Sequence, residues 1–284
     1  MLRLSACLLA ISTLPVFAQS TDIQHEVALG FSDVRDADDN FIGASYRYYF
    51  ESVNIDQQPW SISPYLQRTN NVSVDYFGID NIDSVNVRGE WFYSDGLVIR
   101  GRYGRITNDS RFFDETLNRY ALEVSTFANQ NWEYGIGVEY FHLNEELFSP
   151  INAGVSEKRS DSEFSYSAFA RYTSFGQRSG KFSPGWDTKL KATQFDGEFS
   201  VELDTDYYFR PDWSVGVTYI HESNEVVGSD NVIELGTHYW FNPHSSIEFG
   251  LGYDTDESQL GMKYDEVEEA MDNPNSSNYD KYIK

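Results

Sequence analysis

Residues 198–222 read EFSVELDTDYYFRPDWSVGVTYIHE, and apolar and polar side chains alternate along most of this stretch. The alternation stops at 210–212, where Arg-Pro-Asp separates two runs, because proline cannot lie inside a sheet ladder. Alternation with a period of two gives a β-strand one apolar face and one polar face. The stretch therefore predicts an antiparallel hairpin of two amphipathic strands.

The length of the first arm of this hairpin is unusual for a water-soluble sheet. The arm is about twice the common strand length of about 5–6 residues. Its apolar face carries rings at the ends and aliphatic side chains in the middle: Phe199, Val201, Leu203, Tyr207 and Phe209. About 9–11 tilted residues cross a bilayer, and aromatic side chains favour its two interfaces. We therefore predict an all-β fold, a transmembrane antiparallel up-and-down β-barrel.

Similar alternating segments recur along the chain and give the expected strand count. They lie at 23–31, 41–50, 71–79, 84–94, 97–107, 117–128, 132–143, 163–173, 186–194, 197–209, 213–222, 232–241, 245–254 and 258–265. With fourteen strands, the short connections and both termini lie on one side of the membrane. The long loops then lie on the other side. We predict about fourteen strands, with sixteen as the alternative.

Two connections need separate treatment. Residues 60–67 also alternate, but Pro59 and Pro64 argue against a membrane strand there. We therefore assign 51–70 to a periplasmic connection. The longest predicted loop, 144–162, is the candidate for a segment that folds inward and narrows the barrel.

The two ends of the chain predict secretion and a polar tail. Arg3 precedes an apolar run that ends at Ala18, which is the pattern of a signal peptide cleaved before Gln19. Removing residues 1–18 also removes Cys7, the only cysteine. We expect a signal peptide at 1–18, an outer-membrane barrel at 19–265 and an acidic flexible periplasmic tail at 266–284.

The charge of the chain narrows the possible partners. The formal net charge is −24 from 21 Lys+Arg and 45 Asp+Glu, and loss of Arg3 would leave 20 against 45. This balance excludes a general nucleic-acid binder, which needs a basic surface. After residue 18, no run approaches about 18 consecutive apolar residues, so the sequence predicts no transmembrane helix.

Charged residues at the lumen-facing positions are the candidate pore-lining residues. The bases cluster on the segments at 84–128 and 163–194, and the acids on those at 132–143 and 197–209. Opposed walls of opposite charge would order polar solutes, whereas cross-strand pairing would simply hydrate the lumen. The acid excess favours a weak cation preference. The residues are Arg47, Arg88, Arg100, Arg102, Arg119, Arg171, Lys189, Lys191, Glu90, Glu123, Glu133, Glu139, Glu202, Asp204, Asp206 and Glu234.

One loop has a weak resemblance to a metal site. Asp36, Asp38 and Asn40 place oxygen atoms at a spacing that suits Ca²⁺, but Phe41 follows where an EF-hand loop has glycine. We interpret these residues as a solvated acidic loop near lipopolysaccharide. We expect neither a metal site nor a cofactor.

His221 and Ser223 form the candidate catalytic pair. They lie two residues apart on one strand, on the lipid-facing side, and Glu225 or Glu234 would be the orienting acid. The H-x-S-N string resembles that of outer-membrane phospholipases and lipid A deacylases. The simpler interpretation, which we favour, is a polar strand end that runs into a loop.

The last segment and the repeated strand ends carry a family resemblance. Gln259, Gly261 and Tyr264 resemble the terminal signal read by the barrel-assembly machinery. Strand ends of the form Gly-x-x-Tyr with further aromatics recur, for example at 43–50 and 236–241. Over about 19–265 the chain resembles the general porins of Gram-negative outer membranes. The resemblance implies passive diffusion of small hydrophilic solutes and supplies no catalytic residues.

The leading hypothesis is therefore a non-enzymatic outer-membrane channel for ions and small polar solutes. Its expected partners are outer-membrane lipid, lipopolysaccharide and the barrel-assembly machinery, and the pattern is compatible with a homo-oligomer. The first alternative is an outer-leaflet lipid acyl hydrolase that uses His221 and Ser223. The second is a secreted soluble β-sandwich binding protein.

Overall fold

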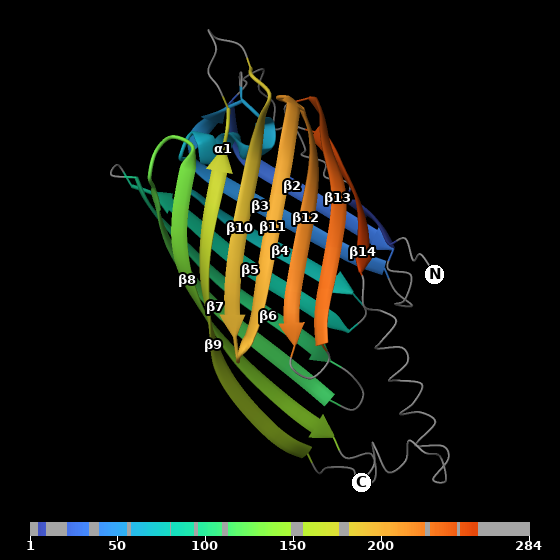
Figure 1. Cartoon of the computed structure of the whole chain (residues 1–284). Helices are drawn as coiled ribbons and strands as arrows, with labels where there is room; N and C mark the ends of the chain where they lie inside the picture. The colour runs from blue at the N-terminus through green and yellow to red at the C-terminus, as the bar shows by residue number, and fades with distance from the viewer. Residues whose placement is uncertain are drawn as a thin grey trace.

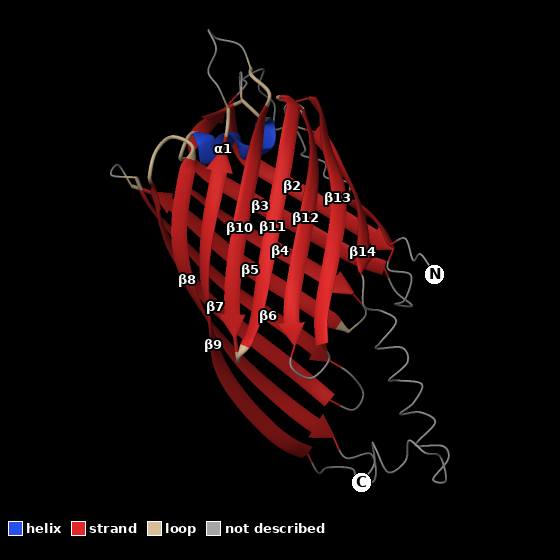
Figure 2. Ribbon diagram, in the orientation of Figure 1, coloured by secondary structure: helices blue, strands red, loops and turns tan. Residues whose placement is uncertain are grey.

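A computed structural model describes residues 5–9, 22–33, 40–55, 58–79, 81–93, 96–109, 113–148, 156–175, 182–224, 228–242 and 245–254. One antiparallel sheet dominates it and curls round on itself (Figure 1, Figure 2). Neighbours in sequence are neighbours in the sheet from β2 to β14, and β1 pairs with β14. The strands are β1 (Ser5–Leu9), β2 (Asp22–Asp33), β3 (Asn40–Asn54), β4 (Asn71–Ile79), β5 (Ile82–Phe92), β6 (Leu97–Asp109), β7 (Phe113–Phe127), β8 (Trp132–Phe148), β9 (Ser156–Thr173), β10 (Gly185–Phe195), β11 (Glu198–Arg210), β12 (Trp213–Asn224), β13 (Gly228–Asn242) and β14 (Ser245–Asp254).

The alternating pattern that predicted the strands also sets which side of the sheet faces outward. Large apolar side chains at outward positions are exposed, among them Ile136 at 68% and Phe241 at 62%. Rings lie near both ends of the strands, for example Trp132 and Tyr140 on β8, and aliphatic side chains lie between them. Such an apolar outer surface is stable only when lipid covers it. The prediction of an up-and-down membrane barrel is confirmed.

Thirteen of the fourteen predicted segments form β2 to β14, with ends that differ by a few residues. The fourteenth, at 258–265, lies outside the described residues, as does the tail at 266–284. The fourteenth strand of the sheet is instead β1, which comes from the stretch predicted as a signal peptide and runs antiparallel along Glu248–Gly252 of β14. β1 also lies beside β2, but within the described residues the two form no ladder, so hydrogen bonds do not close the ring there.

The hairpin of β8 and β9 extends beyond its neighbours at one end of the barrel (Figure 1). Its ladder continues from Asn144, opposite Ser160, to Phe148, opposite Ser156. The expectation that 144–162 folds inward is therefore wrong for 144–148 and 156–162, which prolong the wall. No alternation predicted this extension, because nearly all side chains of these residues are polar or charged, with Leu147 and Phe148 as the exceptions.

We name the two ends of the barrel by their connections. The turn end carries the short links between β7 and β8 and between β11 and β12, and the loop end is the opposite one. At the turn end, residues 58–70 between β3 and β4 form η1 (Trp60–Ile62) and α1 (Ser63–Leu66). We call residues 58–70 the inner segment. As predicted, 60–67 is not a membrane strand.

Within the described residues, no helix is long and apolar enough to cross a membrane. The small buried apolar cluster consists of Tyr49, Val53 and Ile55, with Ile23 and Trp60 packed against it. It lies where the end of β3 leads into the inner segment. This buried apolar cluster thus lies at the turn end of the barrel.

Candidate functional site

The lumen contains a cavity of about 540 Å³ whose lining is mostly polar. Residues from β3 to β11 form its sides, and Ser61, Ile62, Pro64 and Tyr65 of the inner segment close it toward the turn end. Eleven of the predicted lumen residues line it: Arg47, Arg88, Arg100, Arg102, Arg171, Lys189, Lys191, Glu90, Glu123, Glu139 and Glu202. The other five, Arg119, Glu133, Asp204, Asp206 and Glu234, do not line this cavity.

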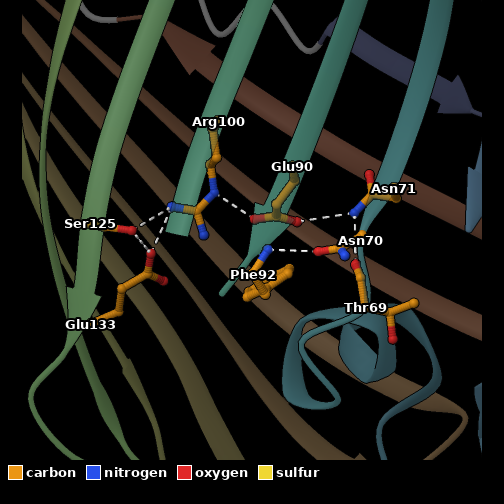
Figure 3. A network of polar contacts seen from close by, with 8 residues as sticks. All are labelled: Thr69, Asn70, Asn71, Glu90, Phe92, Arg100, Ser125 and Glu133. Carbon is orange, nitrogen blue, oxygen red and sulfur yellow. Dashed lines mark hydrogen bonds and ion pairs between the residues drawn. The ribbon is translucent and has the colours of Figure 1, made fainter. Parts of the chain in front are cut away.

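The network around Arg100 joins four strands, β5 to β8, to one another (Figure 3). The Arg100 Nε atom donates to Glu90 Oε1 at 2.5 Å, and Nη1 donates to Glu133 Oε1 at 2.6 Å. Ser125 donates a short hydrogen bond to the same Glu133 oxygen. Glu133 is completely buried, so this carboxylate depends on Arg100 and Ser125 for its solvation.

The same network holds the exit of the inner segment (Figure 3). Asn70 Oδ1 accepts a hydrogen bond from the Phe92 backbone N–H at 2.7 Å. Asn71 donates to Glu90 Oε2 and to the Thr69 carbonyl, both at 3.2 Å. The wall and the inner segment are therefore fastened together by Glu90.

A second network lies farther from the inner segment, on the same wall. Arg102 donates to both Glu139 oxygens at 2.7 Å, and Arg119 donates to one of them at 2.8 Å. Arg102 and Glu139 lie on strands that are not adjacent, and Ala121 of β7 stands between them in the register. Because Ala121 is small, the guanidinium can pass over it and reach the carboxylate. We call β5–β8, with these two networks, the paired wall.

On β9 and β10 the basic side chains gather around two rings. Arg171 makes a two-point contact with Asp187 and lies over the Tyr65 ring at 3.5 Å. Lys191 reaches Glu123 of β7 at 3.6 Å. Lys189 lies over the Phe169 ring at 5.0 Å, and Arg100 lies over the same ring at 5.7 Å.

The opposite wall carries carboxylates with no basic partner. On β11, Asp204 and Asp206 share a face with Glu202, and Glu234 of β13 and Glu248 of β14 extend this surface. Among the described residues, none of the five has a lysine or arginine at ion-pair distance, although Thr218 donates a hydrogen bond to Asp204 at 3.4 Å. We call these five residues the carboxylate wall.

The inner segment spans the barrel between these walls at the turn end. On one side the Trp60 N–H donates to the Pro211 carbonyl at 2.9 Å, and the Trp60 ring meets Trp240 edge-on. On the other side, Tyr65 contacts the rings of Phe92 and Phe127. Attachment to opposite sides holds the inner segment across the opening of the barrel at the turn end, which we call the mouth.

Burial raises the pKa of the Tyr65 hydroxyl above its ordinary range. Desolvation is the main cause; the positive charge of Arg171 opposes the shift, and the carboxylate of Glu133 adds to it. The phenol therefore stays neutral at physiological pH. A neutral ring is a good surface for the guanidinium of Arg171 to stack on.

His221 and Ser223, the predicted catalytic pair, form hydrogen bonds with other residues. His221 Nδ1 and Asn231 Oδ1 are hydrogen-bonded at 2.9 Å, and Tyr219 donates to the same amide oxygen at 2.8 Å. Ser223 Oγ donates to the Phe199 carbonyl at 3.0 Å and accepts from the Phe199 N–H at 2.9 Å. Within the described residues, no hydrogen bond joins His221 to Ser223. Glu225 lies outside the described residues, and Glu234 belongs to the carboxylate wall.

The loop residues Asp36 and Asp38 lie outside the described residues, and Asn40 begins β3. In the part of the chain that the structure describes, no three His, Cys, Asp or Glu side chains gather in a way that could hold a metal ion.

Sequence reasoning missed the inner segment as part of the lumen. Its binding surfaces are rings at lumen-facing positions near the turn end: Phe92, Phe127, Tyr208 and Trp240. Four aromatic side chains at one end of a water-filled lumen would be exposed to water unless another segment covered them. This break in the polar face is the signal that could have predicted an inserted segment.

An apolar exterior, a charged lumen and an up-and-down sheet together define a transmembrane β-barrel of the outer-membrane class. The chain belongs to the family described as "putative general bacterial porin", whose model matches residues 1–264. It is accordingly a porin-like barrel of the bacterial outer membrane.

Three solved structures illustrate what this chain is similar to. The outer membrane protein Omp33 of Acinetobacter baumannii is 17% identical, with coverage of 83% of this chain and 99% of that chain and a TM-score of 0.55. BamA from Haemophilus ducreyi lacking POTRA domains 1–3 is 10% identical, covers 93% and 62%, and has a TM-score of 0.43. The NanC porin is 14% identical, covers 75% and 91%, and has a TM-score of 0.34. Among curated proteins, no sequence matches significantly.

Proposed function

We propose that this protein lets ions and small hydrophilic solutes diffuse passively across the outer membrane through its lumen. The observation that carries the proposal is the polar cavity of about 540 Å³ inside a barrel with an apolar exterior. A barrel of about fourteen strands is wider than its own side chains can fill, unlike one of eight. We assign no catalytic step to it.

The inner segment is the constriction of this channel. It closes the cavity toward the turn end, and contacts on opposite sides of the barrel hold it there. The turn end faces the periplasm in this proposal, because β2 begins there and the hairpin of β8 and β9 projects at the opposite end, where outer-membrane barrels have their longer extracellular connections.

The channel prefers cations weakly. In the part of the chain that the structure describes, the lumen bases on the paired wall have carboxylate partners, whereas the residues of the carboxylate wall form no ion pair with a base. Unpaired charges set the potential that a passing ion meets, since an ion pair is nearly neutral at a distance.

We further propose that residues 1–18 are removed as a signal peptide and that 258–265 then pairs with β14. β1 runs antiparallel to β14 along Glu248–Gly252. A strand that follows β14 through a tight turn would run in the same direction along the same edge. The edge that β1 occupies therefore suits the predicted last strand.

The test of channel function is single-channel conductance of the folded protein lacking residues 1–18 in a planar bilayer. Discrete open steps are expected, with a reversal potential in a salt gradient that shows cation preference. A folded protein that never conducts would overturn the proposal.

The constriction is tested with Trp60→Ala. This change removes an edge-on ring pair worth about 0.5–1.5 kcal/mol and loosens the inner segment. We expect larger or more frequent high-conductance steps. Trp132→Ala, which removes a lipid-facing ring of β8, is the matched control and should leave conductance unchanged. Equal effects of the two variants would contradict the assignment of the constriction.

A further inference from the structure

Most of the described charged side chains that line the cavity form an ion pair with another residue, and two of them do not. Arg47, Arg88, Arg100, Arg102, Arg171 and Lys191 each contact a carboxylate, and Glu90, Glu123 and Glu139 each contact a base. Among the described residues, Lys189 and Glu202 have no partner of opposite charge at ion-pair distance. As far as the described residues show, the cavity lining thus has one cation and one carboxylate that form no ion pair.

Lys189 lies in a basic part of the cavity. Its ammonium group lies over the buried Phe169 ring, with Arg100 over the same ring. Around it, Lys191, Arg100 and Arg171 are basic, and the carboxylate of Glu123 is already in contact with Lys191. Asp204 lies directly opposite on β11, but among the described residues it makes no ion pair with Lys189. A carboxylate that entered the cavity would find an ammonium group available to bind it.

Glu202 lies on the neighbouring strand β11, where the lumen-facing charges change from basic to acidic. In the ladder of β10 and β11, Lys191 faces Glu202 and Lys189 faces Asp204, so Lys189 and Glu202 are diagonal neighbours. Backbone positions in this relation lie about 7–8 Å apart. Among the described residues no ion pair joins Lys189 to Glu202, so a small solute that carries both charges can contact the two side chains together.

We propose that the cavity binds small zwitterionic solutes of the amino-acid or dipeptide kind, with the carboxylate at Lys189 and the ammonium at Glu202. This inference rests on the proposed channel function and names its solute class. A simple anion would meet the repulsion of Glu202, and a simple cation that of Lys189 and its neighbours. A solute with both charges satisfies both groups, so the site discriminates by repulsion as well as attraction.

The test measures how four probes of nearly equal size but different charge reduce the ion current through single channels. They are glycylglycine, a zwitterion; N-acetylglycinamide, which is neutral; N-acetylglycinate, an anion; and glycylglycinamide, a cation. We expect glycylglycine to reduce the ion current at a concentration about tenfold lower than N-acetylglycinamide, which corresponds to about 1.4 kcal/mol. N-acetylglycinate and glycylglycinamide should each require a higher concentration than glycylglycine to reduce the ion current equally.

Variants locate the site. Lys189→Met and Glu202→Gln should each remove most of the advantage of glycylglycine over the neutral probe. Glu234→Gln is the matched control, because it neutralises a lumen-facing carboxylate that does not line the cavity. It should keep the tenfold advantage.

The outcomes separate this inference from the channel proposal. A channel that conducts but is reduced equally by all four probes overturns the zwitterion site and leaves the channel function standing. Loss of the advantage in Glu234→Gln as large as in Glu202→Gln overturns the assigned position. A folded protein without conductance overturns the channel function itself.

Discussion

The two walls of the lumen carry charged residues at equivalent positions, but they use them differently. On the paired wall, Arg100 and Arg102 are locked to carboxylates of β5 and β8. On the carboxylate wall, Asp204 and Asp206 have no base at ion-pair distance among the described residues, although Lys189 faces Asp204 across the ladder. Paired charges cancel at a distance and fix the shape of the wall, whereas unpaired charges act on what passes. A lumen-facing charge therefore has a structural or a selective role according to its partner.

The largest effect is expected from breaking the paired wall at Arg100. Arg100→Met leaves the buried Glu133 carboxylate without its cation, and breaking a buried pair costs about 3–5 kcal/mol. Urea unfolding in detergent micelles measures the loss.

The comparison variant is Arg88→Met, since the Arg88 side chain is 54% exposed. Surface pairs contribute about 0–1 kcal/mol, so this variant should unfold almost like the unchanged protein. Similar losses for Arg88→Met and Arg100→Met would show that the buried network does not hold the wall.

An intermediate effect is expected on selectivity from the carboxylate wall. The double change Asp204→Asn with Asp206→Asn removes two unpaired charges and should lower the K⁺/Cl⁻ permeability ratio about two- to fivefold, since a charge about 4 Å from an ion in water contributes about 1 kcal/mol. Reversal potentials in a KCl gradient give the ratio.

Its counterpart on the other side is Arg88→Met with Asp75→Asn, which removes a cation together with its carboxylate. The ratio should stay where it was. If it falls as far as in the Asp204/Asp206 variant, the distinction between the walls fails.

The smallest effect is expected outside the lumen, at Ser223. Its hydroxyl bonds to the backbone of Phe199, so Ser223→Ala should lower the unfolding free energy by about 1 kcal/mol and leave conductance unchanged. Release of fatty acid from phospholipid vesicles by the unchanged protein, lost in the variant, would instead support the acyl hydrolase hypothesis.

Alternation predicted the wall of the barrel because each strand has one face in lipid and one in the lumen. Beyond the membrane both faces meet water, so the extension of β8 to Phe148 had no pattern to reveal it. Proline correctly excluded a strand at 60–67, but nothing local showed that the segment lies in the mouth.

The partners of individual charges were beyond sequence reasoning. The contact between Arg102 and Glu139 skips a strand and depends on the register of three strands and on the small side chain of Ala121. Similarly, the partner of His221 is Asn231, because the register of β12 and β13 sets them opposite each other.

The inner segment also bears on the order in which the barrel assembles. Trp60 contacts Pro211 and Trp240, which lie far along the chain and belong to the last part of the sheet. These contacts cannot form until β11, β12 and β13 have come round to face β3, and bringing such distant residues together is slow. The mouth is therefore the last part to become native, and a barrel that lacks its final strands keeps an open mouth.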